Sequence, residues 1–101
     1  MAILAPLDQP SAHLKALARV ARLLRDPDID IVDLCVPNMY HAPLAIAALN
    51  AGKHVLVEKP MSTSLQQAAE LVQLSKKSKG LLVCAPHIIL SNTYQEMWRR
   101  L

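Results

Sequence analysis

Apolar residues recur along the chain with two periods, one typical of helices and one typical of strands. Between Ser11 and Arg25 they return every three or four residues, which predicts an amphipathic helix. Runs rich in β-branched and other apolar residues predict three strands, at about 31–36, 54–57 and 81–85. An alanine- and leucine-rich helix is expected at 41–50, and a capping box at Ser64 opens a helix that runs to about Lys79.

The order of these elements predicts an α/β fold. A last helix is expected to begin at Asn92 or Thr93, and Gly52 and Gly80 are expected to cap the two helices before them. Strands that alternate with helices are typical of a parallel sheet with right-handed crossovers. If both crossovers step in the same direction, their helices share one face, which leaves the helix at 11–25 to cover the other. We therefore expect a partial Rossmann-like three-layer fold, with at least three parallel strands and flanking helices.

Composition excludes several classes of protein. The 101 residues make one small domain, and a hydrophobic content of 52% is enough for a packed core. Two glycines are too few for the dinucleotide fingerprint G-x-G-x-x-G, and their separation excludes a phosphate-binding P-loop. The net charge of +3 comes with no nucleic-acid recognition motif. Because no apolar run approaches the ~18 residues of a membrane span, we expect a cytoplasmic protein with neither nucleic-acid nor membrane partners.

The two cysteines carry little functional signal. Cys35 and Cys84 each lie inside an apolar run and lack the C-x-x-C spacing of a zinc site. On the expected sheet they are two strands apart, roughly 9–10 Å, which exceeds the reach of a disulfide. We expect two buried free thiols and no metal site.

The candidate chemistry lies where the expected strands end. In open parallel sheets ligands bind beyond the carboxyl ends of the strands. Three polar segments occupy that edge here, namely Pro37–His41, Glu58–Pro60 and Pro86–His87. This coincidence is the main indication of a site that comes from the residues themselves.

The sharpest change in polarity along the chain lies at Glu58, Lys59 and Pro60, where two charged residues directly follow an apolar strand. At a strand end the ammonium of Lys59 can donate a hydrogen bond to a substrate hydroxyl and stabilise a developing alkoxide. Pro60 fixes the backbone there, and its peptide bond is a candidate for the cis form. The alternative is that Glu58 and Lys59 form only a surface ion pair, and spacing alone does not decide between the two.

The other polar residues near this edge also have a structural alternative. Asn38 either binds a ligand or closes its own turn, and His41 either serves the site or bonds the local backbone at a helix start. His87, after the last strand, is a weaker candidate. His54, which opens a strand, is expected to be half-buried and structural.

The runs Val36–His41 and Ala48–Pro60 resemble those of the glucose–fructose oxidoreductase/inositol dehydrogenase/MocA family. The family pattern is P-N-x-x-H followed by A-L-x-A-G-K-H-V-x-x-E-K-P, and both parts occur here at the right spacing. The resemblance extends from about Asp26 to Leu101. It implies an oxidoreductase that binds NAD or NADP on a Rossmann domain and acts on hydroxyl groups of sugars, polyols or related molecules.

The resemblance also implies roles for individual residues. Lys59 would be catalytic, in contact with the reacting hydroxyl. The cofactor-binding set would line or support the nicotinamide-ribose side of the pocket: Pro37, Asn38, His41, Glu58 and Pro60. His87 falls near a position that faces the substrate in some members, and no metal is implied.

The chain departs from the family pattern at both ends. Residues 1–10 do not resemble the family's glycine-rich first β-α-β unit, and its carboxy-terminal substrate domain is missing. We therefore expect one incomplete dinucleotide-binding domain over residues 1–101, inactive alone, with weak or no cofactor binding. The strand at 31–36 should expose an edge unless Ala2–Ala5 adds a short strand, so self-association is expected. The alternatives are a non-catalytic dimerising or regulatory module derived from the family, and a basic helix surface that binds nucleic acid.

Overall fold

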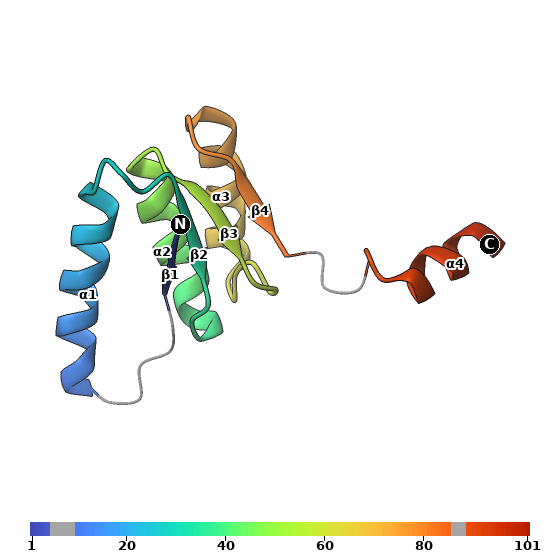
Figure 1. Ribbon diagram of the computed structural model, residues 1–101, viewed down its shortest axis with the longest axis horizontal. Coiled ribbons are helices and arrows are strands. Elements are labelled where there is room, and N and C mark those ends of the chain that lie inside the picture. The colour runs from blue at the N-terminus through green and yellow to red at the C-terminus, as the bar shows by residue number, and fades with distance from the viewer. Residues whose placement is uncertain (5–9, 86–88) are drawn as a thin grey trace.

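The computed structural model describes residues 1–4, 10–85 and 89–101. These residues form a four-stranded parallel sheet in the order β1-β2-β3-β4, with helices between the strands (Figure 1). The elements are β1 (Ala2–Leu4), α1 (Pro10–Arg25), β2 (Ile31–Leu34), the short 3₁₀ helix η1 (Asn38–Tyr40), α2 (His41–Asn50), β3 (His54–Val57), α3 (Leu65–Lys77), β4 (Leu82–Cys84) and α4 (Asn92–Arg100). The expected α/β fold and the expected strand order are confirmed.

The core lies between the sheet and the helices α2 and α3. Alternate residues of β2 and β3 point inward, so that Val32 pairs with Val55 and Leu34 with Val57, all four of them buried. The alanines of α2 allow that helix to approach the sheet closely, and α3 adds the fully buried Leu71. Both helices therefore cover the same face, as the common direction of the crossovers predicts.

The first strand changes two expectations. Residues 2–4 do form a strand, which pairs in parallel with β2, so the edge of β2 that was expected to be exposed is covered. With β1 in place, α1 becomes a crossover of the same hand as the others and falls on the same side of the sheet. Accordingly Leu24 of α1 packs against the α2–α3 core, and the helix does not cover the opposite face.

That opposite face, which we call the open face, stays accessible. It carries the outward residues of the strands, and Ile31 and Val83 are 41% and 50% exposed. Helix α4 leads away from the sheet in Figure 1, with Met97 59% and Trp98 68% exposed. None of the described helices is long and apolar enough to cross a membrane.

The helix ends follow local chemistry with one exception. Ser64 caps α3 and accepts a hydrogen bond from the backbone N–H of Gln67, as the capping box predicts. Gly52 follows α2 with φ of +74°, a conformation that glycine adopts without a Cβ clash. Gly80 does not cap α3, because the helix ends earlier at Ser78. Gly80 is instead buried against the backbone carbonyl of Lys53, where there is no room for a Cβ.

Candidate functional site

The ends of β2 and β3 bring the two sharpest candidate segments together at one edge, which we call the carboxyl edge. Leu34 and Val57 are paired in register, and η1 and the Glu58–Pro60 segment follow directly after them. The buried ring of His41 joins the two segments. Its Nδ1 lies 2.7 Å from the carbonyl oxygen of Pro60, and its Nε2 lies 2.9 Å from that of Val36. Asn38 and Lys59 therefore belong to neighbouring segments of one rim.

The polar side chains on this rim are exposed. Asn38, Glu58 and Lys59 are all open to solvent. Glu58 and Lys59 do not pair with each other, since the ion pairs among the described residues lie within α4. The amide of Asn38 likewise makes no hydrogen bond to another described side chain or backbone group. Three polar groups on one rim are thus free to contact a ligand.

Proline residues shape the backbone of both segments. Pro37 precedes η1 with an extended backbone, and its carbonyl accepts from the N–H of Tyr40 at 2.9 Å, which closes the 3₁₀ turn. The Lys59–Pro60 peptide bond is cis, as the sequence suggested.

His87 lies outside the described residues. His54 is half-buried, as expected, and its Nδ1 accepts a hydrogen bond from the N–H of Leu81.

The exposure of Cys35, at this edge, was predicted wrongly from the sequence. We expected a buried thiol, but Cys35 is exposed, beside the carboxylate of Asp33. Partial desolvation, together with the negative charges of Asp33 and Glu58, raises the pKa of the Cys35 thiol. The alternation along β2 predicts this exposure. Val32 and Leu34 point inward, so Asp33 points outward, and by the same alternation Cys35 should do so too. Cys84 is half-buried, and both thiols are free, as expected.

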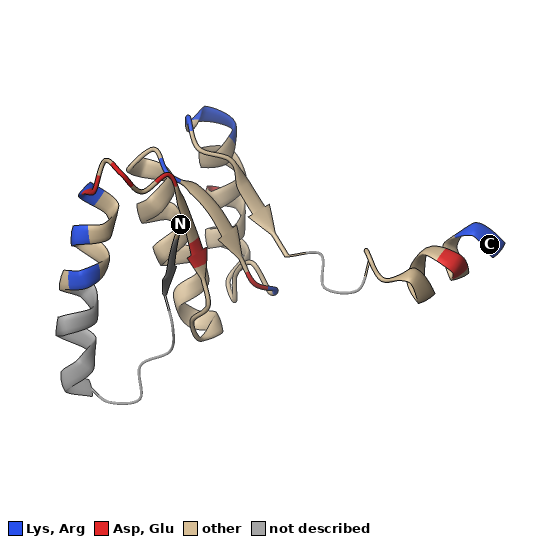
Figure 2. Ribbon diagram, in the orientation of Figure 1, with Lys and Arg blue, Asp and Glu red and all other residues tan. Residues whose placement is uncertain are grey.

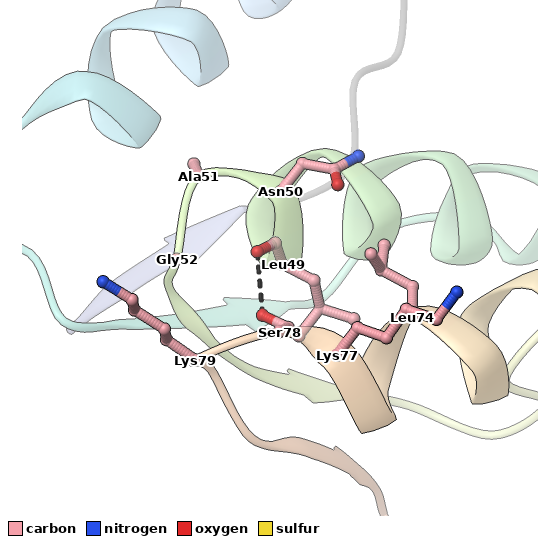
Figure 3. A pocket seen from close by; sticks show the side chains of 8 residues that line it. All are labelled: Leu49, Asn50, Ala51, Gly52, Leu74, Lys77, Ser78 and Lys79. Atoms are coloured by element: carbon pink, nitrogen blue, oxygen red, sulfur yellow. Dashed lines mark hydrogen bonds between the residues drawn. The ribbon is translucent and has the colours of Figure 1, made fainter.

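The opposite, amino edge of the sheet is built differently. Lys53 donates from its Nζ to the carbonyl oxygens of Asp26 and Ile29, each at 2.7 Å. An open groove of about 470 Å³ lies here between the ends of α2 and α3, and Figure 3 shows the hydroxyl of Ser78 bonded across it to the carbonyl of Leu49 at 2.9 Å. Its other polar side chains, Asn50, Lys77 and Lys79, are exposed, and the lysines near the end of α3 are blue in Figure 2.

Comparison with known proteins identifies the family of the chain. Residues 7–85 match the model of a family described as an oxidoreductase family with an NAD-binding Rossmann fold, GFO_IDH_MocA. The chain belongs to this family. The expected resemblance is confirmed, and the family is one of NAD-binding oxidoreductases.

Individual relatives are much longer than this chain. The levoglucosan dehydrogenase of Pseudarthrobacter phenanthrenivorans is 41% identical over 73% of this chain and 20% of its own length. The 1,5-anhydro-D-fructose reductase of Ensifer adhaerens is 36% identical over 73% of this chain and 22% of its own length. The chain thus spans about a fifth of these relatives. A biliverdin reductase of Synechocystis, solved with biliverdin and NADP⁺, superposes with a TM-score of 0.74 at 27% identity, over 91% of this chain and 32% of its own.

Proposed function

We propose that the chain forms one half of a nicotinamide pocket in an enzyme that oxidises or reduces hydroxyl groups of a sugar or polyol. The observation that carries this proposal is the common rim, on which Asn38 and Lys59 stand exposed and unpartnered on two segments joined through His41. Relatives named as dehydrogenases and reductases of sugar-derived compounds support the substrate class.

Each rim residue has a distinct task in this proposal. The ammonium of Lys59 donates a hydrogen bond to the reacting hydroxyl and stabilises the negative charge that develops on the hydroxyl oxygen. Pro37, Asn38 and Glu58 line the side of the nicotinamide ribose, and Pro60 and His41 hold the segments that carry them. Bound NAD or NADP would accept or supply the hydride. The residues of this edge fit the nicotinamide end of such a cofactor.

The other end of the cofactor has no counterpart in this chain. A glycine-rich turn and a helix N-terminus usually hold the pyrophosphate, and two isolated glycines cannot form that turn. We therefore propose that residues 1–101 are one incomplete dinucleotide-binding domain, inactive alone. Titration with NADH, followed by nicotinamide fluorescence, is expected to show no saturable binding below millimolar concentrations. Micromolar affinity would contradict this part of the proposal.

A chimera tests the catalytic role. Residues 26–85 would replace the matching segment of the levoglucosan dehydrogenase, and turnover of levoglucosan would be measured. Turnover by the chimera should fall about tenfold or more in Lys59→Ala, with little change in cofactor affinity, because the lost hydrogen bond acts mainly on the transition state. The matched control is Lys79→Ala, an exposed lysine at the amino edge, which should leave kcat unchanged. An unchanged kcat in Lys59→Ala would remove Lys59 from this role.

Exposed apolar surface favours a second property, self-association. Ile31 and Val83 on the open face, and Met97 and Trp98 on α4, are each at least 41% exposed. Exposed apolar side chains of this size can serve as contacts between molecules. We propose that the isolated chain self-associates, which would also suit a non-catalytic dimerising module. Sedimentation at increasing concentration should show dimers or larger species, and a monomer at millimolar concentration would contradict this.

A further inference from the structure

Helix α4 is amphipathic, yet its apolar side is not buried. None of its residues, all of which the structure describes, is buried, whereas α2 and α3 both contribute buried residues to the core. Apolar side chains nevertheless return along α4 at i, i+3, i+4 and i+7, the spacing that is typical of a helix with one side packed on another surface. We call this set the α4 stripe: Tyr94, Met97, Trp98 and Leu101.

The open face of the sheet offers apolar surface of matching extent. Leu56 and Val83 are paired in register on β3 and β4, and Ile31 adds an apolar side chain on β2. Strands of four residues are about 13 Å long, and β2 and β4, on either side of β3, lie roughly 10 Å apart. The nine residues of α4 form a helix about 14 Å long and about 10–12 Å wide. One helix can therefore cover this apolar surface.

The charges of the two surfaces are opposite. Asp33 points toward the open face, and desolvation together with the negative charges of Asp33 and Glu58 raises the pKa of Cys35, which indicates a negative field at that end of the face. The last turn of α4 carries Arg99 and Arg100, whose side chains are 75% and 78% exposed even within their ion pairs. Docking with the last turn toward Asp33 would bring opposite charges together.

Both surfaces belong to one chain, so a second copy can satisfy them together. Helix α4 leads away from the sheet (Figure 1), which leaves the α4 stripe and the open face of the same copy available at once. One stripe on one face is a small contact, although aromatic side chains bury about 150–250 Å² each. A reciprocal exchange doubles this contact and brings it toward the roughly 1,200–2,000 Å² that specific interfaces bury. Because such an exchange has two-fold symmetry, it closes at the dimer.

We propose that two copies of this chain exchange α4, so that the α4 stripe of each copy docks on the open face of the other, with Arg99 and Arg100 toward Asp33. This inference rests on the proposed self-association and names the surfaces that carry it. It also limits the association to a closed dimer, since each copy uses its one stripe and its one open face.

The fluorescence of the unaltered chain gives the first test. Trp98 is the single tryptophan and lies on the α4 stripe, so its emission reports docking without a label. The emission should move to shorter wavelengths as concentration rises, because the indole leaves water, with the midpoint that sedimentation gives for the monomer–dimer equilibrium. Association without this shift would overturn the proposal. So would a shifted emission in a monomer, which would mean that α4 docks on its own sheet.

Two variants each damage one of the surfaces. Val83→Lys places a positive charge on the open face, against the arginines of α4, and Met97→Ser shortens an apolar side chain of the stripe. Each should weaken the dimer about tenfold or more, because both residues lie within the contact. The matched control is Leu65→Ser, which removes an exposed apolar side chain of α3 outside both surfaces and should leave the dissociation constant unchanged. An unchanged constant in Val83→Lys would show that the stripes pair with each other, and would overturn the proposal.

A mixture of the two variants gives the sharpest test. Val83→Lys keeps an intact stripe and Met97→Ser keeps an intact face, so a mixed dimer retains one complete contact that neither variant forms alone. Sedimentation should therefore show more dimer in the mixture than in either variant at the same total concentration, and an equal amount would overturn the exchange. If either variant does not fold, the emission of the unaltered chain decides. A chain that stays monomeric would overturn the proposed self-association as well, whereas none of these readouts involves NADH or turnover.

Discussion

The two edges of the sheet use similar residues in opposite ways. At the amino edge, the Nζ of Lys53 donates to two carbonyl oxygens, and His54 accepts a hydrogen bond from the N–H of Leu81, just before β4. At the carboxyl edge, Lys59 and Asn38 make no such bonds and stand in solvent. Lys53 and His54 thus hold the fold at one edge, whereas Asn38 and Lys59 remain exposed at the other.

This difference divides a single motif into two parts. Within A-L-x-A-G-K-H-V-x-x-E-K-P, the first part supplies the positive-φ turn at Gly52 and the bonded Lys53 and His54. The second part supplies the exposed Glu58 and Lys59. Not every residue of a family motif is therefore a site residue. In this motif the residues with hydrogen-bond partners hold the fold, and the exposed residues without described partners are the candidates for function.

The largest loss of stability is expected from Gly80→Ala. A Cβ at this position would overlap the backbone carbonyl of Lys53, and neither backbone can move without disturbing the pairing of β3 and β4. We expect a loss of about 2–4 kcal/mol in the free energy of unfolding. Urea denaturation followed by circular dichroism measures it.

The control for that substitution is Gly52→Ala. Gly52 has φ of +74° but nothing within 4 Å of the added Cβ, so only the backbone conformation is penalised. The expected loss is about 1–2 kcal/mol. If the two variants were equally stable, the close approach at Gly80 would not limit the packing of the amino edge.

A pair of lysine substitutions tests the comparison of the edges directly. Lys53→Met keeps the aliphatic stem but leaves the carbonyls of Asp26 and Ile29 without the ammonium, and it should cost about 1–3 kcal/mol of stability. Lys59→Met removes an exposed ammonium that has no described partner and should change stability by less than about 0.5 kcal/mol. Thermal unfolding compares the two, and a larger loss in Lys59→Met would reverse our assignment of the edges.

Local sequence signals predicted the elements well where the cause was local. The helix at 41–50 and the strand at 54–57 have the bounds that propensity and patterning indicate, because alanine and leucine run between Pro37 and Gly52, and a β-branched run follows. Ser64 caps its helix as expected. The expected strand ends further placed Asn38 and Lys59 at one edge, since parallel strands end together.

Features that depend on which segments meet in space were not predictable in this way. The side of the sheet taken by α1 follows from the pairing of β1 with β2, and a three-residue strand carries almost no sequence signal. Gly80 resembles a helix cap in sequence, yet its role is set by the approach of Lys53. The two carbonyls around His41 come from residues 5 and 19 positions away. No local pattern encodes such a contact.

The smallest effect concerns the electrostatics of the carboxyl edge. Desolvation and the charges of Asp33 and Glu58 raise the pKa of Cys35, so its reactive thiolate is scarce near neutral pH. Asp33→Asn removes one of these charges and the hydrogen-bond acceptor, so the pKa should fall and alkylation at about pH 7.5 should accelerate, by roughly two- to tenfold. Above the pKa of the thiol, the alkylation rates of the two proteins should converge.

Iodoacetamide labelling in a Cys84→Ser background measures Cys35 alone. Asp30→Asn, which removes an exposed carboxylate outside this group, is the matched control. An unchanged or slower rate in Asp33→Asn would show that Asp33 does not act on the thiol.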